Sequence, residues 1–320
     1  MMNKKELFQK FSLENEAVIP FSLHFNWWNE VVQNNWDVAV VSNDNQVFAV
    51  WPYFIRKKGI WNLITQPHFT PYSGIYIRYP EGQKVDTKIA FEKKLIEELI
   101  TQLPDFSEWK QNFHLEFKNS LPLIWNGFED QKRFTYILPL TESIESIFLN
   151  FRDNIKKQIR KAEKFLIINE AEDSKKLKQA FESSFEAQNL NSPIDDSMIF
   201  QRIYEYIKKH QLGKVWNVMD QEGNLHAAMC LVWDQHQAYY LIGGAMKEFK
   251  NSGAMSLLMW HAIQNAKTKQ KSKFNFEGSS IEAIEKYLRG FGGELTPFTC
   301  IYKSNSSSLQ LAKKIKKHSI

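Results

Sequence analysis

Two stretches of the sequence repeat the same order of predicted elements. Residues 36–65 contain three β-rich apolar runs separated by turns rich in Asn, Asp, Lys and Gly, which is the pattern of a three-stranded antiparallel meander. Residues 214–243 repeat it, and in each copy a long helical pattern and one more strand follow, at 86–117 and at 254–277. A tandem duplication of one α/β unit explains the repeat. A chance similarity is the alternative, because hairpins are common.

The composition fits two packed domains rather than a disordered chain. The 320 residues include 43% hydrophobic and 14% aromatic residues, enough for a sizeable core. The net charge of +5 permits an acidic partner such as a nucleotide, a phosphorylated precursor or RNA, but falls short of that of a typical nucleic-acid-binding protein. The only two cysteines, Cys230 and Cys300, lie in apolar runs, so we expect buried thiols.

Several classes of protein lack support in the sequence. The N-terminal residues have no apolar signal-peptide core, and no run of about 18 apolar residues occurs, so we expect a cytoplasmic protein without a transmembrane helix. No histidine pair has metal-ligand spacing with a third ligand nearby, and neither G-x-x-x-x-G-K-[ST] nor G-x-G-x-x-G is present. We expect no metal and no tightly bound cofactor.

The second copy of the repeat has the pattern of a ligand site. A strand at 238–244 runs through a Gly-containing loop at 247–253 into a long helix at 254–270, followed by a strand at 273–277 and a helix at 281–290. A helix that begins after such a loop leaves backbone N–H groups free, and the helix dipole adds positive charge there. We therefore expect this loop to face an anionic or carbonyl-bearing donor.

The segment between the two copies is predicted to be helical and basic. Apolar residues recur at three- and four-residue spacing over 143–165, and further helices are expected at 174–189 and 195–211. We place the domain boundaries so that 1–142 form an N-terminal domain, 143–303 a C-terminal domain with the donor site, and 304–320 a basic tail. The tail has the pattern of a short amphipathic helix that touches an anionic membrane or RNA; a frayed terminus is the alternative.

Three strings in the C-terminal half resemble a known family. They are IRKAEK at 159–164, NFEGS at 275–279 and RGFGG at 289–293, and together they resemble the Fem-type branch of the GNAT acyltransferases. The resemblance implies an α/β fold with mixed sheets, built from two tandem GNAT-like (acyl-CoA N-acyltransferase-like) domains. Wall-building members of that branch transfer an amino acid from aminoacyl-tRNA to an amine of a peptidoglycan precursor, and other relatives use acyl-CoA.

Two positions depart from the motifs of that superfamily. CoA-binding GNAT proteins have a small residue at the end of the pyrophosphate loop, where this chain has Met255, and a bulky side chain there crowds a pyrophosphate. Wall-building Fem enzymes have a Phe-Lys pair where this chain has Tyr287-Leu288, so the lysine is absent. The first departure argues against acyl-CoA and the second against aminoacyl-tRNA. Both favour the alternative of a non-catalytic GNAT-like binding module that has lost the donor site.

Two residues are candidates for the chemistry of acyl transfer. Glu277 ends the predicted strand at 273–277 and is suited to take the proton of an attacking amine if burial raises its pKa. A structural or helix-capping carboxylate is the alternative. Tyr287 is suited to donate to a tetrahedral oxyanion, and a packed aromatic ring is the alternative. Ser279 and Ser280 are expected to cap the following helix rather than to act as nucleophiles, because no histidine accompanies them.

Other candidates concern binding. The loop before the helix at 254–270 supplies the donor-binding set, and basic side chains supply an acceptor- or phosphate-binding set, with a solvated helix face as the alternative. The predicted function is transfer of an acyl or aminoacyl group to a small-molecule or wall-precursor amine by direct attack, with tRNA as a possible partner. The donor-binding residues are Lys250, Ser252, Gly253 and Ala254, and the basic residues are Lys156, Arg160 and Arg289.

Overall fold

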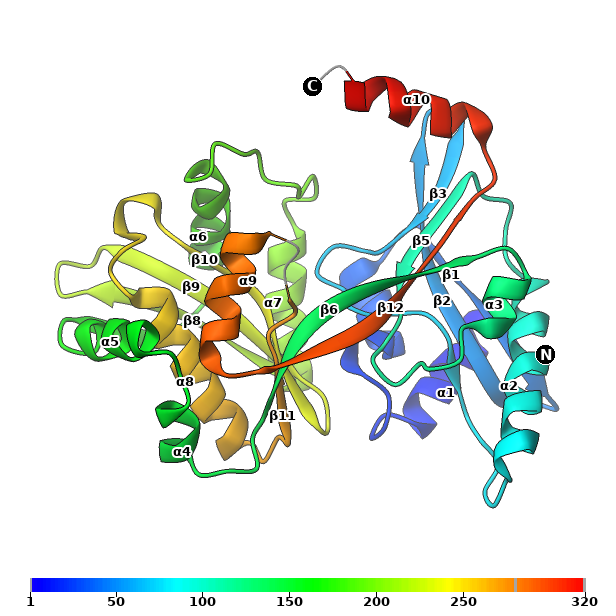
Figure 1. The fold of residues 1–320 in the computed structure, drawn as a ribbon, viewed down its shortest axis with the longest axis horizontal. Helices are drawn as coiled ribbons and strands as arrows, with labels where there is room; N and C mark the ends of the chain where they lie inside the picture. The colour runs from blue at the N-terminus through cyan, green and yellow to red at the C-terminus, as the bar shows by residue number, and fades with distance from the viewer. Residues whose placement is uncertain (1, 279–280, 319–320) are drawn as a thin grey trace. The chain divides into compact units, whose positions relative to one another are not determined.

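The chain divides into two compact units in a computed structural model that describes residues 2–278 and 281–318 (Figure 1). Unit 1 comprises Met1–Arg133 and Pro297–Ile320, and unit 2 comprises Phe134–Thr296. The boundaries lie inside two strands, β6 (Glu129–Pro139) and β12 (Glu294–Ser304). They therefore differ from the boundaries expected at 142/143 and 303/304, because the chain crosses between the units in extended strands rather than in loops.

Unit 1 contains the first copy of the repeat. Strands β1 (Trp36–Asn43), β2 (Gln46–Lys58) and β3 (Trp61–Thr65) form the antiparallel meander, and β5 (Glu108–Asn112) pairs in parallel with β3. Helix α2 (Val85–Ile100) makes the crossover that a parallel pair requires. The remaining elements of unit 1 are α1 (Lys4–Glu14), a 3₁₀ turn (Phe21–Leu23), a π-helix (Trp27–Val32), β4 (Tyr76–Ile77), which pairs with β2, α3 (Leu121–Trp125) and α10 (Ser307–His318).

Unit 2 contains the second copy. Strands β8 (Gly213–Asp220), β9 (Leu225–Trp233) and β10 (Gln237–Ala245) form the meander, α8 (Ala254–Thr268) is the crossover, and β11 (Lys273–Asn275) pairs in parallel with β10. The remaining elements are α4 (Ile144–Leu149), α5 (Asp153–Ala162), β7 (Leu166–Glu170), which pairs with β8, α6 (Lys175–Glu186), α7 (Ile199–His210), a 3₁₀ turn (Lys247–Phe249), α9 (Glu282–Leu288) and a second 3₁₀ turn (Arg289–Phe291).

Each copy is completed by a strand from elsewhere in the chain. After β5 and α3 the chain enters β6, whose last residues pair antiparallel with β11 in unit 2. After β11 and α9 it enters β12, whose last residues pair antiparallel with β5 in unit 1. The sheet orders are therefore β1-β2-β3-β5-β12 in unit 1 and β6-β11-β10-β9-β8-β7 in unit 2. The predicted repeat of element order is present.

The helical segment predicted at 143–165 is two helices, α4 and α5, rather than one. Phe151 lies between them and is buried, with its ring centroid 5.4 Å from that of Trp260 and 5.2 Å from that of Phe291. Arg152 has an extended backbone, and its N–H donates to the carbonyl of Gly290 at 2.8 Å. The helix breaks because this tertiary contact satisfies a backbone group that a continuous helix would bond internally.

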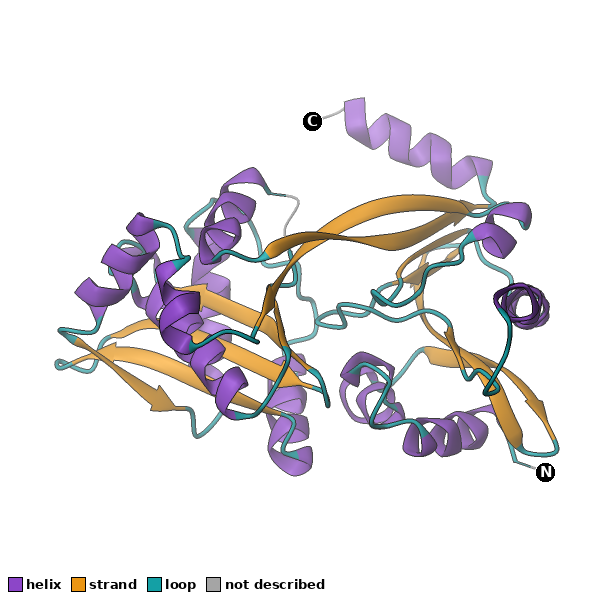
Figure 2. Cartoon of the chain, turned by 60° about the horizontal axis from the view of Figure 1, so that its bottom comes forward, coloured by secondary structure: helices purple, strands orange, loops and turns teal. Residues whose placement is uncertain are grey.

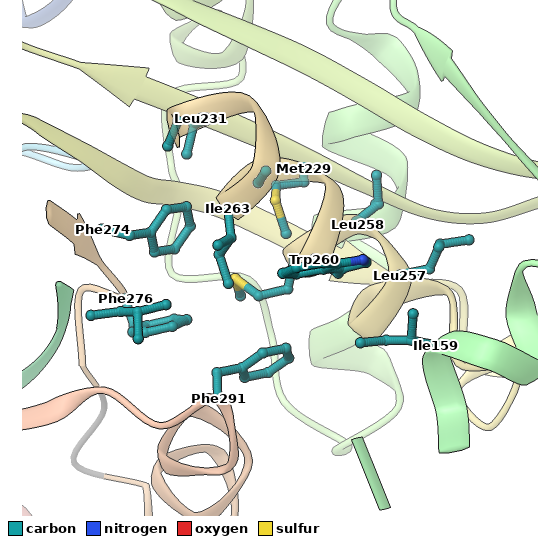
Figure 3. Packing of buried hydrophobic residues seen from close by; sticks show 14 of the residues in the cluster. Ile159, Met229, Leu231, Leu257, Leu258, Trp260, Ile263, Phe274, Phe276 and Phe291 are labelled. Atoms are coloured by element: carbon teal, nitrogen blue, oxygen red, sulfur yellow. The ribbon is translucent and has the colours of Figure 1, made fainter. Parts of the chain in front are cut away.

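Helix α8 lies in the centre of the unit 2 core. Its middle residues Leu258, Met259 and Ile263 are fully buried, and both α6 and α8 pack on β9 and β10 (Figures 2 and 3). Phe276 follows β11 and contacts Phe291, with ring centroids 5.7 Å apart. A helix that is apolar on most of its surface is a core helix, and this burial fixes the end of β11 against the rest of unit 2.

The C-terminal segment forms α10, which packs on unit 1. Leu309 is buried, the Trp61 indole N–H donates to Ser308 Oγ at 3.2 Å, and the Lys313 ammonium pairs with Glu108. The basic tail expected at 304–320 is thus the end of β12 followed by a docked helix. No helix within residues 2–278 and 281–318 is long and apolar enough to cross a membrane.

The exchange of strands predicts where a core substitution acts. Ile301 on β12 is fully buried in the unit 1 core and pairs with Gln111, whereas Leu258 is fully buried in the unit 2 core. Ile301→Ala is expected to cost about 2–5 kcal/mol and to lower amide hydrogen-exchange protection in β5. Leu258→Ala is the matched control, and we expect it to lower amide hydrogen-exchange protection in β9 and β10 of unit 2 instead. Equal loss in both units for Ile301→Ala would contradict the assignment of β12 to unit 1.

Candidate active site

The site begins where β10 and β11 stop pairing. The two strands pair in parallel over three residue pairs only, from Gln237 with Lys273 to Tyr239 with Asn275. Strand β10 continues to Ala245, and its pairing with β9 shifts register between Tyr240 and Ile242. Within the described part of the chain, no strand pairs with the β11 side of β10 beyond Tyr239. Backbone groups on this side are therefore placed to bind a ligand.

A tight turn follows β11 and carries Glu277. Both Glu277 and Gly278 have left-handed backbones, with φ of +60° and +58°. Asn275 Oδ1 accepts the Glu277 N–H at 2.9 Å and the Thr135 hydroxyl at 2.7 Å. A Cβ on Gly278 would lie 2.4 Å from the carbonyl oxygen of Phe134, so only glycine fits there. The turn holds Glu277 in a conformation that a glutamate seldom adopts, which is typical of functional sites.

The Glu277 carboxyl group is desolvated. The residue as a whole keeps some exposure, but Oε1 is buried and has no hydrogen-bond partner among the described residues. Burial raises the pKa of Glu277 well above its ordinary value of 4.5, because the charged form loses its hydration. A carboxylate with a raised pKa is a stronger proton acceptor than an exposed one. Ser279 and Ser280, predicted to cap the next helix, lie outside the described residues.

Tyr287 lies on α9 and contacts the first turn of α8. Its hydroxyl is 3.3 Å from Ser256 Oγ, and the Ser256 hydroxyl donates to Gln158 Oε1 at 2.7 Å. Because serine has a single proton to give, the tyrosine is the donor to Ser256. Burial raises the pKa of Tyr287, and the neighbouring Tyr240 raises it further. The phenol therefore stays protonated at neutral pH and is a hydrogen-bond donor.

The predicted donor loop is tightly packed. Gly253 has φ of +85°, and a Cβ there would lie 2.7 Å from the carbonyl oxygen of Gln158 on α5. The Ala254 N–H donates to Ser252 Oγ at 3.3 Å, and the Ser252 N–H donates to the carbonyl of Phe249 at 2.9 Å. Ala254 is buried, so α5 closes against the first turn of α8.

Lys250 and Met255, before and after Gly253, lie in different environments. Lys250 is exposed, directly after the 3₁₀ turn Lys247–Phe249. Met255 is half-buried and packs against the apolar core of unit 2, together with Tyr240 and Tyr287. The Met255 side chain therefore contributes to the core around the site.

Each of the three basic candidates contacts its own protein group. Lys156 Nζ is 3.0 Å from Asp153 Oδ1 and donates to the carbonyl of Leu149 at 3.0 Å. The Arg160 guanidinium lies 5.6 Å from the ring centroid of Phe148, and Arg289 Nε is 3.1 Å from Glu285 Oε1. Arg160 and Arg289 remain exposed and accessible to an anion, whereas Lys156 is mostly covered.

Sequence reasoning missed Gln158 and Asn275. Gln158 contacts Gly253 through its backbone and Ser256 through its side chain, and Asn275 holds the turn at Glu277. Of these two residues, only Asn275 could have been recognised from the sequence. It lies two residues before Glu277 in a Glu-Gly turn, and Asn side chains often hydrogen-bond to the backbone two residues further on. Among the described residues, no group of three or more His, Cys, Asp or Glu side chains is placed to hold a metal ion.

Comparison with known families assigns this part of the chain. Residues 150–284 match the family described as "Acetyltransferase (GNAT) domain", and this range contains β10, α8, β11 and Glu277. Unit 2 contains a GNAT domain. The match supports an acyltransferase of the GNAT type, as the resemblance implied. No curated protein matches the sequence.

Solved structures extend the similarity to the whole chain. The crystal structure of FemX is 13% identical with a TM-score of 0.64, covering 93% of this chain and 96% of that one. L-PGS from Bacillus licheniformis is 13% identical, with a TM-score of 0.54 and coverage of 95% and 93%. A tandem GNAT protein from the clavulanic acid biosynthesis pathway is 8% identical, with a TM-score of 0.50 and coverage of 85% and 84%. Identities this low establish the fold alone, and the predicted Fem-like tandem GNAT fold is confirmed.

Two glycines with the same backbone angle test the packing of the donor loop. Gly253 and Gly223 both have φ of +85°, but a Cβ on Gly223 meets nothing within 4 Å. Gly223→Ala is expected to lose about 1–2 kcal/mol from backbone strain alone. Gly253→Ala is expected to lose roughly 1–3 kcal/mol more, because α5 must shift. Urea unfolding measures both, and equal losses would show that α5 does not press on the loop.

Proposed function

We propose that the chain transfers an acyl or aminoacyl group to a primary amine by direct attack in unit 2. The observation that carries the proposal is the Oε1 atom of Glu277, which is buried and has no hydrogen-bond partner in the described part of the chain, at the point where β11 turns away from β10. A buried carboxylate oxygen without a partner among the described residues is available to accept a proton from a substrate, and a desolvated carboxyl group in such a position is a functional-site candidate. The GNAT domain match over 150–284 supports the reaction class.

The chemistry needs no covalent enzyme intermediate. The lone pair of a neutral amine forms a bond to the carbonyl carbon of the donor, and the carbonyl oxygen becomes an oxyanion. Glu277 takes one proton from the attacking nitrogen, and the C–S or C–O bond to the leaving group then breaks. Backbone N–H groups on the unpaired side of β10 stabilise the oxyanion. The Tyr287 phenol has a single proton, which it gives to Ser256 in this structure, so it becomes a donor for the oxyanion or the leaving group only when its O–H turns away from Ser256.

The donor in this proposal is an acyl-CoA or an aminoacyl-tRNA. Both donors carry phosphate groups behind the reactive ester or thioester, and the exposed Lys250 and Arg160 supply cations for them. The close packing of Gly253 against Gln158 and the placement of Met255 leave little room for a pyrophosphate at the first turn of α8. These contacts favour a donor held mainly by its ester or thioester end, with phosphates outside the loop.

The acceptor in this proposal is a small molecule or a wall precursor with a primary amine. While Glu277 is protonated, its buried carboxyl group favours entry of the neutral amine over the ammonium form. Attack by the amine requires the deprotonated form of Glu277, which takes the amine's proton. The reaction rate should therefore rise with pH as Glu277 loses its proton. A non-catalytic binding module, the alternative from the sequence, predicts donor binding or no binding without any amine product.

A donor screen tests the proposal. Purified protein is mixed with acetyl-CoA, longer acyl-CoAs or aminoacyl-tRNA and a panel of primary amines, and the amide product is measured by mass spectrometry. We expect one donor to give amide that saturates with amine. Glu277→Gln is expected to lower kcat/KM by roughly 10²–10⁴-fold, the usual contribution of a general base. With a weakly basic aromatic amine as acceptor, the variant should also lose the acid limb of the pH profile, whose midpoint lies above 4.5 in the native protein.

The exposed Glu186 on α6 provides the matched control. Glu186→Gln removes the same charge from the surface and should leave kcat/KM and its pH profile unchanged. Absence of product with every donor would overturn the enzymatic proposal. Product formation that Glu277→Gln leaves intact would retain acyl transfer but reject Glu277 as the base.

A further inference from the structure

Helix α10 presents two different apolar surfaces. Leu309 is 2% exposed and packs on unit 1, and Lys313, four residues later on the same face, pairs with Glu108. Leu311 and Ile315 are also four residues apart, but each is 61% exposed. A helical residue two positions on points about 200° away, so the Leu311 and Ile315 face is the outer one. The helix is docked on one side and apolar on the other.

The hairpin between β2 and β3 lies beside this helix. The Trp61 indole N–H donates to Ser308 Oγ at 3.2 Å, which joins the first residue of β3 to the first turn of α10 (Figure 1). Lys58 pairs with Trp61 across a two-residue turn, Gly59-Ile60, in which Gly59 has φ of +57°. The turn leaves Ile60 87% exposed, and the exposed Lys57 and Lys58 precede the turn. A large aliphatic side chain at a hairpin tip gains nothing from the fold of unit 1.

The Trp61–Ser308 hydrogen bond brings the hairpin tip next to α10, and both carry exposed apolar side chains and lysines. We define the hairpin-helix patch as Ile60, Leu311 and Ile315 with Lys57, Lys58 and Lys314. Apolar side chains flanked by lysines are the combination that binds an anionic bilayer surface, where the apolar groups enter the acyl region and the ammonium groups meet phosphates. Trp61 adds an aromatic ring with a polar N–H, which suits the interface between lipid and water.

We propose that the hairpin-helix patch docks the protein on an anionic membrane surface. The acidic side chain of Glu108 beneath α10 does not oppose this, because it is buried and already accepts from Lys313 and Tyr302. Both parts of the patch come from unit 1, so docking does not depend on the acyl-transfer chemistry proposed for unit 2. A single exposed helix face binds weakly, and the hairpin tip provides the second attachment that makes binding stable.

Vesicle flotation tests the proposal with the full chain. Vesicles of phosphatidylglycerol and phosphatidylcholine are compared with vesicles of phosphatidylcholine alone, at low and at high salt. We expect binding to the anionic vesicles only, weakened by salt because the lysines contribute through screened charge. The double variant Ile60→Ser with Leu311→Ser should weaken binding by about ten-fold or more, because it removes two apolar contacts with the acyl region.

Ile89→Ser is the matched control, since Ile89 is a 51% exposed isoleucine on α2 of the same unit. It should bind like the native protein, and circular dichroism and urea unfolding should be the same for all variants. Three results would overturn the proposal: no binding to anionic vesicles, equal binding to neutral ones, or equal loss with Ile89→Ser. If RNA at equal charge displaced the protein from the vesicles, and the double substitution did not change that displacement, the lysines would be assigned to RNA instead.

Discussion

The candidate site depends on the short parallel ladder between β10 and β11. Three residue pairs join the strands, and β10 then continues for six more residues, Tyr240 to Ala245, along a side where the described residues provide no strand partner. A longer β11 would satisfy those backbone groups and leave no place for a carbonyl. The turn at Glu277 and Gly278 ends the ladder, so the same feature that opens the sheet also places the buried carboxyl group at the opening.

Strand β6 holds that turn in place. Thr135 donates to Asn275, the Phe276 N–H donates to the carbonyl of Tyr136, and the carbonyl of Phe134 leaves room only for glycine at position 278. These residues precede the GNAT match over 150–284, yet they fix its proposed base. The matched region is therefore not the whole of the working structure. Each sheet is completed by a strand from outside its own copy of the repeat, because β6 pairs with β11 and β12 pairs with β5.

Local pattern predicted much of the fold. The two meanders, the crossover helices and the strand after each could be predicted because turn residues and apolar periodicity are short-range signals. The strand exchange could not, because the partner of β12 is set by contacts about 190 residues away along the chain (Cys300 with Asn112), and periodicity does not specify a partner. The break at Phe151 was missed for the same reason, since its burial against Trp260 and Phe291 overrides a helical pattern.

The candidate site was predicted in part. Glu277 stood out because it ends the strand predicted at 273–277, and the structure adds the burial of its carboxyl group, which no sequence pattern reports. Tyr287 contacts the first turn of α8 through Ser256, a contact that spans two elements and leaves no local signal. The basic residues were predicted by charge alone, and each has a protein partner: Asp153 for Lys156, Phe148 for Arg160 and Glu285 for Arg289.

The central claim is that Glu277 is a buried carboxyl group with a raised pKa. Between its unfolded and folded pKa values the native state holds a proton that the unfolded state has lost, so this group makes stability fall as pH rises. A ¹³C NMR titration of the side-chain carboxyl carbons, with the Glu277 signal identified by its absence in Glu277→Gln, measures the pKa directly. The account predicts a midpoint well above 4.5. A midpoint at or below 4.5 would contradict it.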